Sequence, residues 1–221
     1  MSKAPAAAAA AAVPDSREEI LQAAAELFMA YGYTATSIDA VAERLGATKG
    51  RIYHHWRSKS DLYFDVQVAA MTRVTEAVEP IARRPGSAAE RLAAMALCHA
   101  QILLNELPMQ KVAVQGLERQ LLGSASGQAP AAKRLRAVVQ LRDDYERLFA
   151  EVIDDGIRAG DFIDLPPRLA TKPFFGVLNW ATVWYSPRRL QSAEAIAELA
   201  QLLADYAMRG ILKPGRGSAG P

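Results

Sequence analysis

Five cationic side chains lie close together in the first third of the chain, and no acid stands between them. Residues 44–60 contain no Asp or Glu, and their cations are Arg44, Lys49, Arg51, Arg57 and Lys59. Such groups bind phosphate oxygens, and an arginine can also donate two parallel hydrogen bonds to O6 and N7 of guanine. The whole chain is nearly neutral, with 26 Lys and Arg against 24 Asp and Glu, so the positive potential is local. The alternative interpretation is an ordinary solvated helical face.

Two short helices joined by a glycine turn would carry these cations. Ser37 can cap the first helix, and apolar residues then recur with the spacing of one buried helical face: Ile38, Val41, Ala42 and Leu45. The pattern predicts a helix over 38–45, which Gly46 ends. Thr48 can cap a second helix, with Ile52 and Trp56 four residues apart on its inner face. Two helices joined by a short turn that contains glycine form the helix-turn-helix motif of DNA readers.

Helices are also predicted on both sides of this pair. Ser16 and Glu19 match a capping box and predict the start of the first helix. Its apolar stripe would be formed by Ile20, Ala24, Leu27, Phe28 and Tyr31. Ser58 and Asp61 make the same kind of box at the start of a helix that we expect to reach about Val78. That helix would connect the DNA reader with the rest of the chain.

The order of these elements resembles the TetR family of bacterial transcriptional regulators. In that family a three-helix N-terminal domain ends in a tyrosine-containing recognition helix, followed by a phenylalanine, a lysine and a fourth helix. The resemblance covers about residues 15–66 and rests on Gly32, Thr36, Ala42, Gly46, Gly50, Tyr53, His55, Lys59 and Leu62. Trp56 stands where phenylalanine is commoner, and we expect it to keep the role of a core aromatic residue.

The resemblance implies roles for individual residues. Thr36 and Ser37 would contact the phosphate backbone at the start of the second helix, and Lys59 would hold a phosphate at the entry to the fourth. The residues on or beside the helix that enters the major groove would be Thr48, Lys49, Gly50, Arg51, Tyr53 and His54. Arg51 is the expected reader of guanine. His55 either contacts DNA or packs its ring against the domain.

Metal binding, catalysis and membrane insertion are not expected. His54 and His55 are adjacent, so on a helix they point about 100° apart, and no cysteine or third histidine is near them in the sequence. The three histidines, one cysteine and scattered carboxylates form no nucleophile or acid–base constellation. No apolar run reaches the roughly 18 residues of a membrane span. We therefore expect neither an enzyme nor a cofactor-dependent protein.

The rest of the chain is predicted to be helical, with breaks at proline and glycine. The expected helices are Ser87 to Glu106, Pro108 to Gly123, Ala131 to Ala159, Pro167 to Tyr185 and Ser192 to Gly210. The predicted fold class is all-α, with an N-terminal three-helix helix-turn-helix domain and a larger C-terminal helical ligand-binding and dimerisation domain. The expected divisions are a disordered arm over 1–14, the DNA-binding domain over 15–62, the larger domain over 63–212 and a flexible tail over 213–221.

Two polar residues interrupt apolar stripes in the larger domain. Arg142 falls between Val138 and Tyr145, and a buried arginine needs an anionic partner. That partner is either an acid of another helix or a negatively charged ligand. His99 interrupts a second stripe, either as a hydrogen-bonded core histidine or as a group that contacts a ligand.

The segment over 173–185, PFFGVLNWATVWY, is apolar around almost its whole circumference. Such a helix must be covered on more than one side, so its own core on one face and a second subunit on the other fit best. The final helix adds a second apolar stripe, formed by Ile196, Leu199, Leu203 and Tyr206. Two such helices from each chain predict a homodimer, which would set two recognition helices about 34–36 Å apart on a near-palindromic site. Pro173 is expected to kink the first of these helices.

The C-terminal half is similar to TetR-family regulators of fatty-acid and steroid catabolism, which are repressors released by acyl-coenzyme A thioesters. The similarity implies a homodimeric repressor of the bacterial cytoplasm and nucleoid that an acyl-coenzyme A releases from its operator. The expected effector-binding residues are His99, Arg142, Tyr145, Asn179, Trp180 and Trp184. A different hydrophobic effector, such as a drug or an aromatic compound, is one alternative. A helical interaction module without DNA function is the other.

Overall fold

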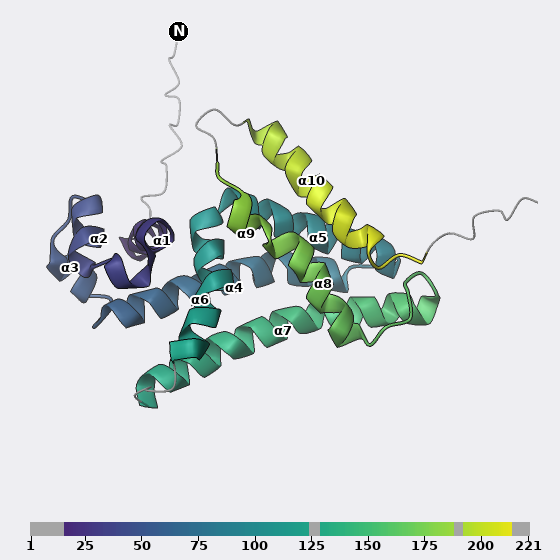
Figure 1. Cartoon of the computed structure of the whole chain (residues 1–221), viewed down its shortest axis with the longest axis horizontal. Helices are drawn as coiled ribbons and strands as arrows, with labels where there is room; N and C mark the ends of the chain where they lie inside the picture. Colours follow the sequence, from purple (N-terminus) through teal and green to yellow (C-terminus); the bar gives the residue numbers. More distant parts are fainter. Residues whose placement is uncertain (1–15, 124–128, 188–191, 214–221) are drawn as a thin grey trace, which may run out of the picture.

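Helices account for the regular structure of the described part of the chain (Figure 1). The computed structural model describes residues 16–123, 129–187 and 192–213. Within these ranges the one strand-like pairing is an isolated antiparallel bridge between Phe162 and Leu212. The all-α prediction is confirmed. The predicted arm over 1–14 lies outside the described residues, as does the predicted tail except for Lys213.

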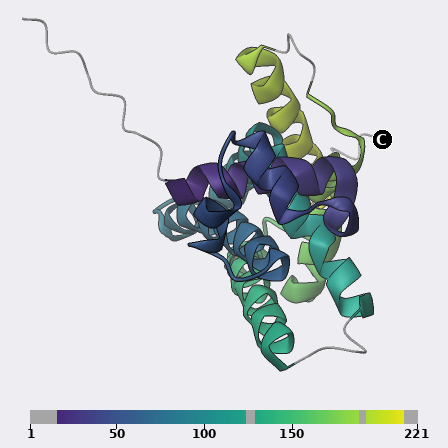
Figure 2. The same ribbon diagram turned by 90° about the vertical axis from the view of Figure 1, so that its left-hand side faces the viewer.

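The first three helices, α1 (Ser16–Ala35), α2 (Ile38–Arg44) and α3 (Lys49–Tyr53), form a head at one end of the molecule (Figure 1), and Figure 2 shows this head facing the viewer. Their apolar faces meet in a small core that contains Ile20, Ala24, Phe28, Val41 and Ile52. Gly46 has a φ of 59° and turns the chain after α2, as predicted. Tyr31 was expected in the apolar stripe of α1, but its side chain is 68% exposed. The stripe ends there because Gly32, with φ 79° and ψ 169°, leaves the helical conformation.

The fourth helix, α4 (Lys59–Arg83), links the head to the larger domain. The Ser58 hydroxyl accepts a hydrogen bond from the backbone N–H of Asp61, so the predicted cap is confirmed. The helix continues past the expected end near Val78 and runs through Pro80. Pro80 is exposed, so its ring lies outside the core. The predicted domain boundary at residues 62 and 63 falls inside this continuous helix.

The larger domain consists of α5 (Ala88–Asn105), α6 (Leu107–Gly123), α7 (Ala129–Ala159), α8 (Pro167–Asn179), α9 (Ala181–Trp184) and α10 (Ala193–Arg209). α4 packs against α5, α6 and α7, while α10 covers α5 and α8. α6 also touches α1, so the head contacts the larger domain directly as well as through α4. Ser87 and Glu90 form the predicted capping box at the start of α5.

The helix expected from Pro167 to Tyr185 is divided at Trp180. α8 passes through Pro173 without an assigned break, and the interruption comes seven residues later. The hydroxyl of Thr182 donates to the Asn179 carbonyl at 2.8 Å, and the Val183 N–H bonds to the Trp180 carbonyl instead. This three-residue spacing tightens the turn between α8 and the short α9.

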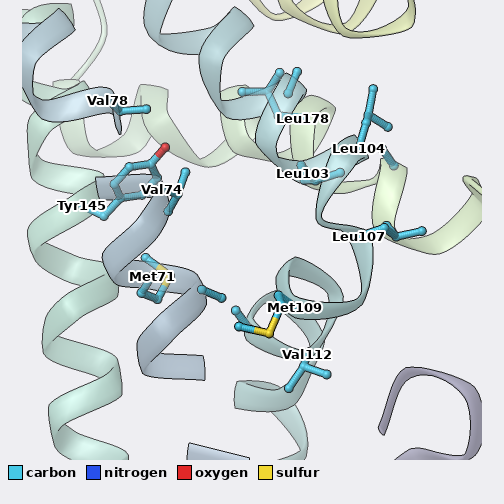
Figure 3. Packing of buried hydrophobic residues seen from close by; sticks show 14 of the residues in the cluster. Met71, Val74, Val78, Leu103, Leu104, Leu107, Met109, Val112, Tyr145 and Leu178 are labelled. Atoms are coloured by element: carbon cyan, nitrogen blue, oxygen red, sulfur yellow. The ribbon is translucent and has the colours of Figure 1, made fainter. Parts of the chain in front are cut away.

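The main core lies where α4 to α8 meet. Figure 3 shows Met71, Val74 and Val78 in a row along α4, with Tyr145 of α7 beside them. Leu103, Leu104 and Leu178 close the core from α5 and α8. No single helix in the described ranges is long and apolar enough to cross a membrane. α5 and the first part of α6 reach that length and composition only as a pair bent by 105°.

Candidate DNA-binding head and effector pocket

The short helix α3 presents most of its side chains to solvent. Ile52 is buried beneath it, whereas the predicted contact residues Lys49, Gly50, Tyr53 and His54 are exposed. Thr48 takes the N-cap position, but its hydroxyl makes no capping hydrogen bond, contrary to the prediction that it caps the helix. A Cβ on Gly50 would meet only the Thr48 hydroxyl, at an ordinary 3.7 Å. The fold therefore does not require glycine at position 50. A binding partner that approaches the backbone closely would require it.

Three of the five cations in the 44–60 window already have carboxylate partners. Arg44 lies 2.7 Å from Glu26, and Lys49 lies 2.6 Å from Asp39. The Nη2 atom of Arg51 lies 2.6 Å from Glu19 on α1, with both side chains about one-third exposed. Over residues 16–66, six Lys and Arg stand against seven Asp and Glu. The head as a whole is therefore not basic, and its positive charge is confined to the surface around α3.

Arg57 and the two adjacent histidines complete this surface. Arg57 is exposed, and no acid within the described ranges lies within 4 Å of it. The rings of His54 and His55 are 5.0 Å apart, and both residues are exposed. His55 also lies 5.3 Å from the ring of Trp56. Across the described residues, no group of three or more His, Cys, Asp or Glu side chains gathers to hold a metal ion.

Lys59 lies against the protein instead of facing outward as a phosphate ligand. Its ammonium donates to the carbonyl oxygens of Tyr33, Thr34 and Thr36 at 2.8, 3.2 and 2.8 Å. It also lies 4.5 Å from the centre of the Tyr33 ring. An ammonium has three N–H donors, and all three are used here. In this structure Lys59 therefore fixes the chain that leaves α1 and leads into α2, and the predicted phosphate contact would require it to give up at least one of these bonds.

Thr36 is also turned inward. It is 3% exposed, and its hydroxyl donates to the carbonyl oxygens of Gly32 and Leu27. The proton of its hydroxyl is therefore used within the head, at the end of α1. Ser37 is exposed, but its hydroxyl accepts from the Ala40 N–H as the cap of α2. Both side chains therefore hold the start of α2 in place, while Ser37 also stays exposed to solvent.

Trp56 adds a hydrogen bond that phenylalanine cannot make. Its Nε1 atom donates to Asp65 of α4 at 2.8 Å, and the Arg17 guanidinium binds the same carboxylate oxygen at 2.8 Å while lying over the Trp56 ring. Trp56 is 2% exposed, so the expected core role is confirmed. The contact joins α1, the chain after α3 and α4, and so orients the head on the long helix.

The larger domain contains a cavity of about 360 Å³ among α4, α5, α6, α7 and α8. His99, Arg142, Tyr145 and Asn179 line it, which brings together four of the six predicted effector residues. Its apolar wall is formed by Met71, Val74, Ala113, Val114 and Phe175. Trp180 and Trp184 do not line it, and they are 62% and 50% exposed. Even on an unbroken helix, Trp180 would point about 100° and Trp184 about 140° away from Asn179, so neither shares its face.

A buried polar trio stands in this cavity. His99 Nδ1 lies 2.9 Å from the Tyr145 hydroxyl, and its Nε2 lies 3.0 Å from Asn179 Oδ1. Burial lowers the pKa of His99 to about 4, although the bond to Asn179 acts in the opposite direction. Burial likewise raises the pKa of Tyr145 well above its ordinary value. His99 and Tyr145 are therefore uncharged near neutral pH.

Charged side chains lie at the outer part of the cavity. Arg142 is half-buried, and none of the described acids lies within 4 Å of its guanidinium. Lys172 binds Glu146 at 2.7 Å, and the Thr171 hydroxyl donates to the same carboxylate. Burial alone would raise the pKa of Glu146, but these two hydrogen bonds and the charge of Arg142 hold it below its ordinary value. The ion pair expected of Arg142 with an acid of another helix is absent from the described part of the protein.

Two family models cover most of the chain. One, described as "Tetracyclin repressor-like, C-terminal domain", matches residues 85–211, and the other, "Bacterial regulatory proteins, tetR family", matches residues 20–66. The chain belongs to the TetR family. The division into a short N-terminal and a longer C-terminal TetR part follows the order of the head and the larger domain.

Individual TetR-family proteins resemble this one over most of their length. The HTH-type transcriptional repressor KstR2 of Mycobacterium tuberculosis is 25% identical over 213 residues, covering 92% of this chain and 96% of that protein. The crystal structure of PfmR from Thermus thermophilus is 26% identical with a TM-score of 0.71, covering 86% of this chain and 97% of that one. AibR, solved in complex with isovaleryl coenzyme A and operator DNA, shares the fold at a TM-score of 0.67 and 20% identity, covering 85% and 96%.

Several pocket residues of this TetR-family chain were missed by sequence reasoning. Lys172, Phe175 and Gly176 line the cavity beside Asn179. Their spacing of three and four residues places them on one face of α8, a signal that the sequence contained. Glu146 stands one turn after Arg142 and was available by the same rule. Gln110 of α6 is buried among apolar residues, and no sequence pattern marked it.

Proposed function

We propose that this TetR-family protein is a homodimeric repressor that leaves its operator when a small molecule, best an acyl-coenzyme A thioester, fills the cavity around His99. Arg142 carries the proposal. Its guanidinium lies at the edge of an apolar cavity, with no described carboxylate within 4 Å. A ligand with an apolar part and a negatively charged part complements both regions of such a pocket.

The proposed DNA contacts come from the exposed surface around α3. We assign them to Ser37, Thr48, Lys49, Gly50, Arg51, Tyr53, His54 and His55, and add Arg57 as an exposed cation. Arg51 must leave Glu19 before it can contact the edge of a base. A guanine can accept two hydrogen bonds from it. Thr36 and Lys59 act on DNA binding through the shape of the head, because their donors are used within it.

The proposed subunit interface lies on α8, α9 and α10. Large apolar side chains are exposed together on these helices: Leu169, Val177, Trp180, Val183, Trp184, Leu202 and Tyr206. Single exposed apolar residues are common, but a group of this size that includes two tryptophans is typical of an interface. A second copy is the partner we propose, because a two-fold dimer also supplies the two heads that a near-palindromic operator needs.

The cavity and the neighbouring surface suit a thioester of coenzyme A. A volume of about 360 Å³ accommodates an acyl group and leaves the phosphate-bearing part outside. A second hollow of about 420 Å³ lies between α7 and α8 and shares Glu146 and Lys172 with the cavity. Arg147 and Arg168 line it and offer cations to phosphates. AibR, a fold relative solved with isovaleryl coenzyme A, supports the same class. A neutral hydrophobic effector is the alternative, because Glu146 offsets part of the charge of Arg142.

The route from the cavity to the head runs along α7. Arg142 and Tyr145 face the cavity, and Arg134, eight residues or about 12 Å before Arg142 on the same helix, lies 2.8 Å from Asp61 at the start of α4. An effector that shifts α7 would therefore move the base of the head. It weakens DNA binding only by its preference for the non-binding arrangement, typically ~1–3 kcal/mol.

Binding to a DNA fragment enriched from a random pool tests the proposal. We expect a sequence-specific complex that weakens steeply as salt rises and that an acyl-coenzyme A dissociates. The matched variant Arg142→Met should keep DNA binding and lose the response. If operator affinity were unchanged by every acyl-coenzyme A that demonstrably binds the protein, the induction proposal would be wrong. A salt-independent interaction with DNA would instead favour a helical interaction module.

A further inference from the structure

We infer that the effector carries a carbonyl oxygen in the part that enters the cavity, and that the side-chain amide of Asn179 binds it. The inference rests on the proposed effector pocket and specifies the chemistry of its buried end. The pocket would therefore prefer an effector whose acyl chain or ring carries a carbonyl group over a plain hydrocarbon of the same shape. The directions of the hydrogen bonds in the trio of His99, Tyr145 and Asn179 decide which donor is left for a ligand.

The trio has a defined hydrogen-bond direction. Asn179 Oδ1 can only accept, so the Nε2 atom of His99, 3.0 Å away, must carry the ring proton. The Nδ1 atom of a neutral His99 then has a lone pair and accepts from the Tyr145 hydroxyl at 2.9 Å. The single proton of Tyr145 is therefore used, and both ring nitrogens of His99 are satisfied.

The Nδ2 group of Asn179 is left over. It carries two N–H donors, and within the described part of the chain it makes no hydrogen bond. Nδ2 is not fully buried, so it remains accessible to a ligand. Asn179 also lines the cavity. His99, which bonds to the same side chain, cannot accept from Nδ2, because both of its ring nitrogens are already paired.

A neutral acceptor on the ligand completes this arrangement. The two buried partners in the trio, His99 and Tyr145, carry no charge near neutral pH, because burial keeps both neutral. A carboxylate there would lack a counter-charge, whereas a ketone or ester carbonyl needs only the N–H donors. If the Asn179 amide were turned over, it would donate to Nε2 and free the Tyr145 proton. A donor to the ligand therefore remains in both arrangements, and Tyr145→Phe separates them.

Cyclohexanone and methylenecyclohexane form a matched probe pair that does not depend on coenzyme A. They have nearly the same shape and differ by C=O against C=CH₂. Dissociation constants would be measured by ligand-observed NMR on the full chain. We expect the ketone to bind roughly tenfold or more tightly, because the hydrocarbon would cover the Asn179 amide without giving its N–H donors a partner. Asn179→Leu should abolish the preference, and Tyr145→Phe should keep it. Asn105→Leu applies the same change to an exposed amide and should behave as wild type.

The outcomes separate this inference from the proposed function. Equal binding of the two probes to the wild type, or an unchanged preference in Asn179→Leu, overturns the inference. A preference lost in Tyr145→Phe but kept in Asn179→Leu overturns the assignment of the donor to Asn179. A parallel series of hexanoyl-coenzyme A and its oxo derivatives tests the coenzyme A proposal. If the ketone preference holds while no thioester binds, the inference stands and the thioester proposal fails.

Discussion

The replacement of Lys59 by methionine separates a structural lysine from a phosphate-binding one. Methionine keeps most of the apolar stem and removes the ammonium that bonds to the carbonyls of Tyr33, Thr34 and Thr36. Hydrogen bonds that involve a charged group contribute ~1.5–3 kcal/mol each. The bond to Thr34 is exposed, so water replaces much of it, and the three bonds share one charge. We therefore expect a loss of about 2–3 kcal/mol of unfolding free energy, including ~0.5–1 kcal/mol from the Tyr33 ring.

Two measurements on the same variant decide the question. Thermal unfolding should show a fall in Tm of about 5–10 °C for a chain of this size. The slope of log K against log salt for DNA binding, measured where the variant is fully folded, should equal that of the wild type. A lost phosphate contact would instead lower that slope by about 0.9 for each subunit that binds DNA and leave stability nearly unchanged. Arg57→Met is the control, because this exposed cation should show the second pattern. A stable Lys59→Met protein with a reduced salt slope would refute the reasoning.

Three other perturbations test separate parts of the structure. Glu19→Gln removes the acid 2.6 Å from Arg51, and fluorescence anisotropy at fixed salt should show operator binding about two- to fivefold tighter, the equivalent of an exposed pair worth ~0.5–1 kcal/mol; unchanged or weaker binding contradicts it. The pKa of His99 falls from an ordinary 6.5 to about 4 on burial, so its contribution of roughly 3 kcal/mol is present above pH 6.5 and lost as pH falls towards 4. The unfolding free energy of His99→Gln, measured in urea, should fall less than that of the wild type between pH 6.5 and 5. The same pH dependence in both proteins would contradict this. The double variant Trp180→Ser and Trp184→Ser should sediment as a folded monomer, and a persistent dimer would place the interface elsewhere.

The helices could be predicted from the sequence because their signals are local. The predicted caps at Ser37, Ser58 and Ser87 each accept the expected hydrogen bond from the backbone N–H three residues later, and Ser192 does the same. Such bonds depend on neighbouring residues only, so a sequence contains all the information they need. Apolar spacing likewise identified Ile52 and Trp56 as core residues. The division at Trp180 was not predicted. A distant residue also takes part there, because Gln115, 67 residues earlier, donates to the Thr182 carbonyl, and no local pattern indicates such a contact.

The site was predicted less completely, because partners distant in sequence decide the role of a charge. Residues 44–60 contain no acid, yet Glu19, Glu26 and Asp39 reach their cations from α1 and α2. Lys59 finds its three carbonyls more than 20 residues earlier in the chain. His99 and Asn179 meet across 80 residues. Their residue types suggested polar core groups, but only the packing of α5 against α7 and α8 brings them to one cavity.

The ion pairs of the head bear on how a nearly neutral domain can select DNA. Arg51 gives up Glu19 whenever it contacts any DNA, so the loss of that pair is the same for every sequence. In exchange, Arg51 makes a single charged contact with a phosphate, whereas with a guanine at the right position it makes two hydrogen bonds in a water-poor groove. Loss of the pair with Glu19 therefore weakens binding at random sites by about as much as at the operator. Only at the operator do the new hydrogen bonds of Arg51 fully offset that loss. Glu19→Gln should accordingly strengthen binding to random DNA as well, while the ratio of specific to non-specific affinity stays the same or falls.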